Sequence, residues 1–331
     1  MGDLTYREAL RRALDDELAR DPDVFLMGEE IGRFEGSYKV TAGLWQKYGP
    51  ARVRETPISE EGFIGAGIGA AMMGLRPVVE IMTINFILVA MDQVINHAAK
   101  IRYMFGGTVG VPLVIRTPAG AGAQLTAQHS QSLEGWFAGC PGLKVVAPAS
   151  PADAYGMLKT AIRDDDPVLF VENLVMYNVT GPMPEDTDYT VPFGLAAVVR
   201  EGTDLTIVAH SYAVQRALRV ADNLSRDGIE AEVIDLRSLR PLDAETVAES
   251  VRKTNRALIA EEGWSTYGVG AELAARIHRL CFDDLDAPVE RVGGAEVPMP
   301  YSKPLELAAL PLEAKIEAAA RELLAESGIT G

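Results

Sequence analysis

The stretch that decides the fold reads Glu55-Thr56-Pro57-Ile58-Ser59-Glu60-Glu61-Gly62-Phe63-Ile64-Gly65-Ala66-Gly67-Ile68-Gly69-Ala70-Ala71-Met72-Met73-Gly74. An extended run ends at Pro57, and Ser59 stands where the N-cap of the next helix belongs. Glu60 and Glu61 then fill the first turn. Such carboxylates have an ordinary explanation, because they complement the helix dipole for about 0.3–1 kcal/mol each. The stretch predicts a strand, a sharp turn and a helix that begins with acidic residues.

This predicted helix consists largely of glycine and alanine. Each interior glycine costs about 0.5–1 kcal/mol relative to alanine, so the close approach of another backbone is the expected compensation. At helical spacing Gly62, Ala66 and Gly69 share one stripe on which a second helix can pack. We therefore expect Glu60 at the mouth of a crowded apolar seam between subunits.

Composition indicates a globular chain that is long enough for two domains. The chain has 331 residues, of which 48% are hydrophobic and 24% charged. Its net charge of −16 argues against nucleic acid or an anionic membrane surface as a partner. The same charge favours a basic protein partner, with a solvated acidic surface as the alternative. Its most apolar stretch is too short and too polar to span a membrane.

The two cysteines, Cys140 and Cys281, lie far apart and lack the spacing of metal ligands. A disulfide framework is not expected, and a reducing cytosol fits this pattern. The first residues read directly into an amphipathic helix and show no secretion signal. Together these features predict a cytoplasmic location.

Helices and strands alternate along the chain, beginning with a helix capped by Thr5 and Glu8. The first half contains strand patterns at residues 24–27, 77–82, 111–116, 143–147 and 167–172, a long helix pattern at 87–105, and a helix start at Ser150. The second half contains strand patterns at residues 205–209, 231–236, 257–260 and 289–292, and helix patterns at 214–224, 244–252, 269–280 and 312–324. This alternation predicts α/β domains with largely parallel sheets covered by helices on both faces.

The alternation lapses between residues 179 and 193, where glycine, proline and acidic residues are typical of a linker. We therefore expect a domain at residues 1–180, a linker at 181–193 and a smaller α/β domain at 194–331. Common site motifs are absent from the sequence: the dinucleotide fingerprint at a strand-to-helix turn, the phosphate-binding loop, a Cys/His zinc cluster and the serine nucleophile elbow.

Several longer motifs occur in order: Gly28-Glu29-Glu30-Ile31-Gly32, Thr56-Pro57-Ile58-Ser59-Glu60, Gly74-Leu75-Arg76-Pro77, Asp92-Gln93-Val94-Ile95-Asn96, Gln128-His129-Ser130-Gln131, Cys140-Pro141-Gly142-Leu143-Lys144, Ser238-Leu239-Arg240-Pro241-Leu242-Asp243 and Val297-Pro298-Met299-Pro300-Tyr301. Over essentially the whole chain they resemble the beta subunits of thiamine-diphosphate-dependent 2-oxo acid dehydrogenases, the pyruvate dehydrogenase decarboxylase component in particular. The resemblance implies a thiamine-diphosphate-binding, pyrimidine-type doubly wound parallel sheet domain, followed by a smaller transketolase C-terminal-like α/β domain.

The resemblance also implies cofactor contacts. Glu60 matches the acid that holds a proton opposite a ring nitrogen of the aminopyrimidine, and an apolar seam favours its protonated form. Glu29 matches a second carboxylate beside the cofactor, with a structural role equally open. Ile58 and Phe86 match positions that pack against the aminopyrimidine, and the alternative is that each is an ordinary core residue.

Histidine offers a second catalytic candidate. His129 follows a glycine-rich loop in a polar motif, a setting suited to proton transfer or substrate orientation. The resemblance places it in the active site, close to the incoming lipoyl group. His97 and His278 lie in predicted helices and are expected to be structural or at the surface, while the role of His210 is left open.

A structural potassium site is a third implication of the resemblance. Main-chain oxygens supply most of its ligands, at Leu113, Ala161, Ile162, Asp164 and Asp166. An acidic helix-to-strand loop without any ion is the alternative.

The chain lacks the Gly-Asp-Gly motif and downstream Asn-Asn that bind magnesium and diphosphate in this superfamily. In the split members of the superfamily that motif belongs to an alpha subunit. The resemblance therefore implies an α2β2 heterotetramer that shares thiamine diphosphate, with magnesium held by the alpha subunit. It also implies that the acidic surface docks the subunit-binding domain of a lipoyl acyltransferase core.

The expected activity is oxidative decarboxylation of pyruvate, with reductive acetylation of the lipoyl group and acetyl-CoA formation downstream. Oxidation of acetoin or of branched-chain 2-oxo acids is a close alternative, because it uses the same machinery. A non-catalytic α/β scaffold is the alternative from another class, and in it Glu60 would be only a charge at a helix start.

Overall fold

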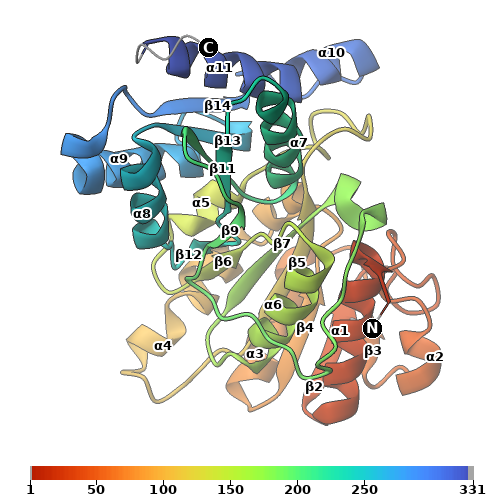
Figure 1. Ribbon diagram of the computed structural model, residues 1–331. Helices are drawn as coiled ribbons and strands as arrows, with labels where there is room; N and C mark the ends of the chain where they lie inside the picture. The colour runs from red at the N-terminus through yellow and green to blue at the C-terminus, as the bar shows by residue number, and fades with distance from the viewer. Residues whose placement is uncertain (1, 327–331) are drawn as a thin grey trace. The chain divides into compact units, whose positions relative to one another are not determined.

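The computed structural model describes residues 2–326. By packing, the chain divides into two compact units, which are described separately (Figure 1). The first unit takes the chain up to Ala119 and then Trp136–Phe193, and the second takes Gly120–Gly135 and the chain from Gly194 onward. The sequence predicts residues 120–135 in the first domain, whereas these residues pack with the second unit.

The first unit is built on a parallel sheet in the order β6-β7-β5-β4-β2-β3. Its strands are β2 (Val24–Gly28), β3 (Val53–Glu55), β4 (Arg76–Glu80), β5 (Val114–Ala119), β6 (Lys144–Val146) and β7 (Val168–Asn173). Its helices are α1 (Tyr6–Arg20), α2 (Leu44–Tyr48), α3 (Glu60–Met72), α4 (Ile101–Met104) and α6 (Pro151–Arg163), and α5 (Glu134–Ala138) begins in the second unit. The short strands β1 (Leu4–Thr5) and β8 (Thr180–Gly181) pair antiparallel.

The switch point of this sheet is at β2. From β2 the chain moves to β3 on one side and then returns to β4 on the other side. In doubly wound sheets ligands bind outside the carboxyl ends of the strands at such a point. The residues after β2, β3 and β4 are therefore the place in this unit where a site is expected.

Two helix starts confirm the caps expected from the sequence. The Thr5 hydroxyl accepts a hydrogen bond from the Glu8 N–H at 3.3 Å, and the Thr5 N–H donates to the Glu8 carboxylate at 2.9 Å. Ser150 accepts from the Asp153 N–H at 3.1 Å, with Pro151 in the first turn of α6. Ser59 occupies the N-cap position of α3, but its side chain makes no capping hydrogen bond to the described residues.

The prediction of one long helix at residues 87–105 is wrong. This region contains a 3-10 helix (Ile84–Leu88), a π-helix (Gln93–Ala98) and then α4. Its apolar side chains are buried at helical spacing throughout: Ile87, Ala90, Val94, Ala98 and Ile101. Apolar spacing reveals which face is buried but does not distinguish a continuous α-helix from short pieces of different pitch.

The segment predicted as a linker packs against α6. The Tyr155 hydroxyl donates to the Thr187 carbonyl at 2.7 Å, and the Thr160 hydroxyl donates to the Val191 carbonyl at 2.8 Å. Gly156 is required here, because a Cβ on it would lie 2.8 Å from the Tyr189 ring. This segment is therefore fixed to the first unit.

The second unit contains a sheet in the order β14-β13-β10-β11-β9, parallel except for β9. Its strands are β9 (Ala197–Arg200), β10 (Leu205–Ala209), β11 (Ala231–Asp235), β12 (Ser238–Arg240), β13 (Ala257–Trp264) and β14 (Glu290–Gly294). Its helices are α7 (Tyr212–Arg226), α8 (Ala244–Thr254), α9 (Val269–Cys281), α10 (Lys303–Ala309) and α11 (Glu313–Glu326).

The longest helices of residues 2–326, α1 and α7, have 15 residues each. None of the helices in that range has both the length and the apolar character needed to cross a membrane. The apolar face of α7 is buried instead, through residues such as Val214, Val220 and Leu224.

Candidate functional site

Three buried carboxyl groups lie at the carboxyl ends of neighbouring strands of the first unit. Glu29 follows β2, Glu60 begins the helix after β3, and Glu80 ends β4. Their exposed fractions are 7%, 5% and 9%. Burying several carboxylates is costly unless they are paired or protonated, so the partners of each group decide its chemistry.

Glu80 is neutralised by a buried arginine. The Arg116 guanidinium lies 2.7 Å from Glu80 and 2.6 Å from Glu172, and the Tyr177 hydroxyl donates to Glu172 at 2.6 Å. Burial acts to lower the pKa of Arg116, but the charges of Glu172 and Glu80 outweigh it and raise that pKa. The contact with Arg116 thus fixes the Glu80 side chain in a buried network. The sequence patterns did not reveal this network.

Glu29 behaves differently. Its Oε1 atom is buried and has no hydrogen-bond partner among residues 2–326. Burial, and then the charges of Glu60, Glu30 and Glu80, raise the pKa of Glu29 to about 7. Glu29 therefore takes up and releases its proton near neutral pH, close enough to the other predicted carboxyl group, Glu60, for the charge of Glu60 to contribute.

This raised pKa predicts a pH-dependent effect of Glu29→Gln on stability. The pKa of the Glu29 carboxyl is 4.5 in the unfolded reference and about 7 in the folded chain, so between these values the folded state binds more protons. The wild-type free energy of unfolding should therefore lose the Glu29 contribution as pH rises through this window. Glu29→Gln cannot ionise, so its stability relative to wild type should increase from about pH 5 to about pH 8 in urea unfolding.

Glu61→Gln is the matched control, because Glu61 is an exposed carboxylate in the first turn of α3. Its stability difference from wild type, measured over the same pH range, shows how much of any pH dependence comes from removing a carboxyl group near the start of α3. Parallel stability curves for Glu29→Gln and wild type would contradict the raised pKa.

Ile58 and Phe86 are the predicted apolar contacts. Ile58 is 83% exposed, in the turn that leads into α3, so the alternative of an ordinary core residue is wrong for Ile58. Phe86 is half-buried in the 3-10 helix after β4. An isoleucine exposed to this extent beside a buried Glu60 fits a residue that is covered by a ligand or a partner.

The glycines of α3 have two different roles. Gly67 faces the sheet, where a Cβ would lie 3.0 Å from Val79, so this glycine permits the packing of α3 on β4. Gly62, Ala66 and Gly69 lie on the exposed side, and a Cβ on Gly69 would meet no atom of the described chain within 4 Å. The predicted small-residue stripe is therefore present and uncovered by residues 2–326.

A hollow of about 460 Å³ lies beside the carboxyl ends of β2 and β3. Its lining residues follow these strands or end them: Glu30, Arg33, Phe34, Glu55 and Thr56. The Arg33 N–H donates to Glu55 at 2.8 Å, and a Cβ on Gly32 would lie 2.7 Å from the Glu55 side chain. The Gly28-Glu29-Glu30-Ile31-Gly32 motif contains one of these lining residues, Glu30.

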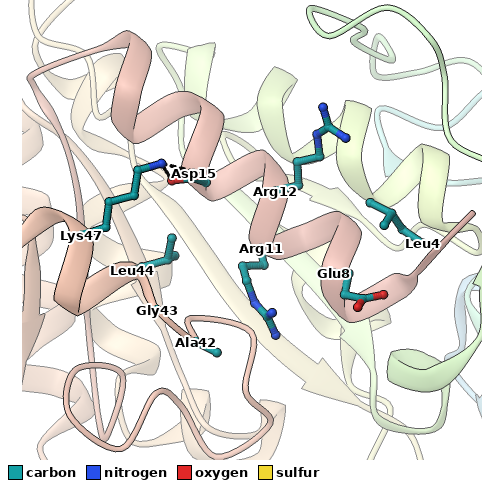
Figure 2. Close-up of a pocket in the computed structure, with 9 residues that line it drawn as sticks. All are labelled: Leu4, Glu8, Arg11, Arg12, Asp15, Ala42, Gly43, Leu44 and Lys47. Carbon is teal, nitrogen blue, oxygen red and sulfur yellow. Dashed lines mark hydrogen bonds and ion pairs between the residues drawn. The ribbon is translucent and has the colours of Figure 1, made fainter. Parts of the chain in front are cut away.

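A second hollow, of about 440 Å³, lies between α1 and α2 (Figure 2). Lys47 contacts Asp15 at 2.6 Å, and Arg11 donates to the Lys39 carbonyl at 2.7 Å. Arg11 and Arg12 point to different sides of α1 in Figure 2, so they do not converge on one ligand. The predicted site residues do not line this hollow, and we do not assign it a function.

His129 lies exposed in the segment Gly120–Gly135, which belongs to the second unit. Two non-glycine residues of this segment have positive φ, Gln124 at 56° and Thr126 at 64°. Such conformations cost on the order of 1–3 kcal/mol each and are unusual for a β-branched residue. His129 therefore lies on a loop with strained backbone conformations. Such conformations are found more often at functional sites than elsewhere.

His210, left open by the sequence, is buried and pairs with Glu134 at 3.0 Å. Burial lowers the pKa of His210, but the hydrogen bond to Glu134 and the charges of Glu134, Glu261 and Asp235 outweigh burial and raise it. The hydrogen bond thus ties a buried histidine of the second sheet to the residue at which α5 begins. Glu134 gave no sequence signal, because its partner is distant in the chain.

Two of the five predicted potassium ligands, the carbonyl groups of Ile162 and Asp164, both accept hydrogen bonds from Arg76. Arg76 Nη1 lies 3.1 Å from the carbonyl oxygens of both Ile162 and Asp164. The Leu113 and Ala161 carbonyls each accept one backbone N–H, and a carbonyl oxygen can accept two.

The side chains of the two predicted aspartates are neutralised, since Asp164 pairs with Lys144 at 2.6 Å and Asp166 with Arg102 at 2.5 Å. Within residues 2–326, no cluster of three or more His, Cys, Asp and Glu side chains could hold a metal ion. Any ion at this position would depend on main-chain oxygens.

Comparison with known proteins identifies the family. The family described as "Transketolase, pyrimidine binding domain" matches residues 2–178, and "Transketolase, C-terminal domain" matches residues 194–316. The mitochondrial pyruvate dehydrogenase E1 component subunit beta of Drosophila melanogaster is 54% identical over 312 residues, which are 93% of this chain and 86% of that protein. The chain belongs to the family of pyruvate dehydrogenase E1 beta subunits. The subunit beta-1 of Arabidopsis thaliana is 53% identical over the same shares of both chains.

The fold comparison agrees with this beta-subunit family. A solved structure titled "Split gene transketolase, inactive beta4 tetramer" has a TM-score of 0.79 and covers 98% of this chain and 99% of its own. At 23% identity this likeness shows the fold alone. It confirms the transketolase-like arrangement of two α/β domains predicted from the sequence.

One prediction is overturned by the same beta subunits. The relatives from Drosophila melanogaster, Arabidopsis thaliana and Bos taurus are named as mitochondrial, which contradicts the predicted cytoplasmic location. The prediction was wrong because few cysteines indicate only a reducing environment, and such an environment is not unique to the cytosol.

Proposed function

We propose that this chain is the catalytic beta subunit of a pyruvate dehydrogenase of the acetyl-transferring kind. With an alpha subunit it would oxidatively decarboxylate pyruvate and acetylate the lipoyl group of an acyltransferase core, which feeds acetyl-CoA formation. The observation that carries the proposal is the buried Glu60 beside the proton-holding Glu29 at the switch point of the first sheet. Family membership supports the choice of reaction.

Thiamine diphosphate is the proposed cofactor, and the residues of this chain fit it. When bound, it supplies a thiazolium carbon that adds to the 2-oxo group of the substrate. A nitrogen heterocycle of this kind needs a carboxyl partner and apolar contacts. Glu60 and Glu29 offer the first, with a buried Glu29 oxygen still free to bond, and the exposed Ile58 and the half-buried Phe86 offer the second.

Glu60 is the residue to which we assign the central proton. Its carboxyl group would hold a proton against the ring nitrogen of the aminopyrimidine, which activates the cofactor's own amino group as a base. Glu29 would keep a second proton within the same carboxyl cluster, because its pKa is about 7. We assign no proton to Glu80, because its ion pair with Arg116 fixes the Glu80 side chain.

We assign His129 to the later transfer step. An exposed imidazole on a strained loop can orient the substrate or the lipoyl group and move a proton. His97 is half-exposed and contacts Asp92 at 3.5 Å, which supports a surface role for it.

The partners follow from what this chain exposes. The uncovered stripe of α3 supports an interface within an α2β2 heterotetramer, and large apolar side chains of the first unit are exposed as well: Met73, Val89, Tyr103 and Met104. The alpha subunit would hold magnesium and the diphosphate. The charge of −16 supports docking of a basic segment of the lipoyl acyltransferase core. A potassium ion on the main-chain oxygens around Ile162 and Asp164 remains part of the proposal.

A substrate comparison tests the choice of pyruvate. In the assembled α2β2 enzyme, we expect kcat/KM for pyruvate to exceed that for a branched-chain 2-oxo acid and for acetoin by at least about 10-fold, because each extra methylene in a fitted pocket costs about 10–200-fold. The measurement is the steady-state rate at which the lipoyl group is reduced and acylated with each substrate, at equal enzyme concentration. A higher kcat/KM for a branched-chain acid or acetoin would assign the chain to that alternative.

A further inference from the structure

The segment Gly120–Gly135 connects two elements of the first unit, yet it packs with the second unit. A hydrogen bond from the Gly120 N–H to the Gln131 carbonyl, at 3.1 Å, closes its base. His129 lies inside this loop. The question is which groups of the second unit hold such a loop in a strained conformation.

The first such group is Glu306 of α10. Its exposed fraction is 1%, and its Oε1 atom accepts the N–H groups of both Gly122 and Gln124 at 3.0 Å. Gln124 is one of the two non-glycine residues of the loop with positive φ. A buried carboxylate is retained only when it is hydrogen-bonded, and its charge strengthens bonds to backbone N–H groups. The bonding of Glu306 therefore favours this one arrangement of the loop.

The second group is His210. It contacts Glu134 at 3.0 Å, on the other side of His129 in the sequence. His210 directly follows β10, and β10 lies between β11 and β13, so His210 marks the switch point of the second sheet. Asp235, at the end of β11, and Glu261, in β13, belong to the same edge. Doubly wound sheets bind ligands at this edge. In this chain, His210 at the same edge binds the Glu134 side chain instead.

We propose that Glu306 and the His210–Glu134 pair are positioning residues that fix the loop of His129 from both sides. The proposal rests on the catalytic role of His129 proposed above. The second unit would then contribute to catalysis through these residues, which hold the His129 imidazole in place for the transfer step but do not contact the substrate.

The test uses Glu306→Ala in the assembled α2β2 enzyme, alone and combined with His129→Ala. A misplaced catalytic group costs up to about 100-fold, so we expect Glu306→Ala to lower the overall rate by about 10–100-fold. In the His129→Ala background the same change should alter the rate by less than about twofold, because residues that act through one group are not additive. Hydrogen exchange of the backbone of residues 122–131 should accelerate by about 10-fold or more.

Further variants test whether the effect of Glu306→Ala is specific. Glu306→Gln keeps the shape of the side chain and one acceptor oxygen, so it should show a smaller loss and covers the case in which Glu306→Ala fails to assemble. His210→Gln retains a donor near the position of Nε2 and should be more active than His210→Ala. Glu322→Gln is the matched control, because Glu322 is an exposed carboxylate of α11, and it should change neither rate nor exchange.

Unchanged exchange of residues 122–131 in both Glu306 variants would overturn the proposal. An equal rate loss with and without His129 would also overturn it, since Glu306 would then act through the fold. Full activity of His129→Ala would refute the catalytic role of His129, whereas faster exchange in the Glu306 variants would still support the fixation of the loop.

Discussion

Glu60→Gln is expected to abolish pyruvate decarboxylation in the assembled enzyme. Glutamine matches the size of the glutamate side chain but cannot hold or release the carboxyl proton. Loss of a positioned acid costs about 10²–10⁴-fold, so turnover should fall by at least 100-fold. The measurement is carbon dioxide release from pyruvate with alpha subunit, magnesium and thiamine diphosphate supplied.

Glu61→Gln is the control for Glu60→Gln. Both carboxylates lie in the first turn of α3, but Glu61 is exposed whereas Glu60 is 5% exposed. Each substitution replaces one carboxyl group at the same helix N-terminus, so a helix-dipole role for both residues would give similar effects. Normal assembly on size exclusion should accompany both variants. Equal activity of the two variants would support the scaffold alternative.

His129→Ala is expected to separate two steps of the reaction. Overall transfer to the lipoyl group should fall by about 100-fold or more, the usual range for a lost proton-transfer group. Decarboxylation followed with an artificial electron acceptor should fall much less, because we assign the first proton to Glu60. The readout is the ratio of the two rates in the same preparation.

His97→Ala is the control for His129→Ala. His97 is also partly exposed and lies in the π-helix of the first unit, where it contacts Asp92. It should leave both rates within about twofold of wild type, as surface substitutions usually do. A loss of both steps to the same extent in His129→Ala would contradict the assignment of His129 to transfer.

Much of the first site was predictable from local sequence. The strand, turn and helix around Glu60 are predicted from Pro57, from Ser59 at the N-cap position and from the acidic residues that follow it. In the structure Glu60 is buried at the start of this helix. The motif resemblance added Glu29, Ile58 and Phe86. The burial of Glu29 and the exposure of Ile58 give these residues distinct settings that residue type alone does not predict.

The remaining features depend on which elements become neighbours. Arg116 lies on β5, and its partners Glu80 and Glu172 lie on the strands to either side, so only the strand order brings them together. Glu134 and His210 are 76 positions apart, and Glu306 is 184 positions from Gly122. Periodicity carries no information on such pairs. The sequence also did not predict the mixture of helix types at residues 84–104, because the apolar spacing in these pieces resembles that of one continuous helix.

The central claim is that Glu60 supplies the proton that activates the cofactor. The most direct measurement is the rate at which thiamine diphosphate, bound to the α2β2 enzyme in D₂O, exchanges the hydrogen on its thiazolium carbon. We predict that Glu60→Gln slows this exchange by at least about 100-fold relative to wild type, while Glu61→Gln does not. Exchange in Glu60→Gln at the wild-type rate, with the cofactor bound, would contradict the account.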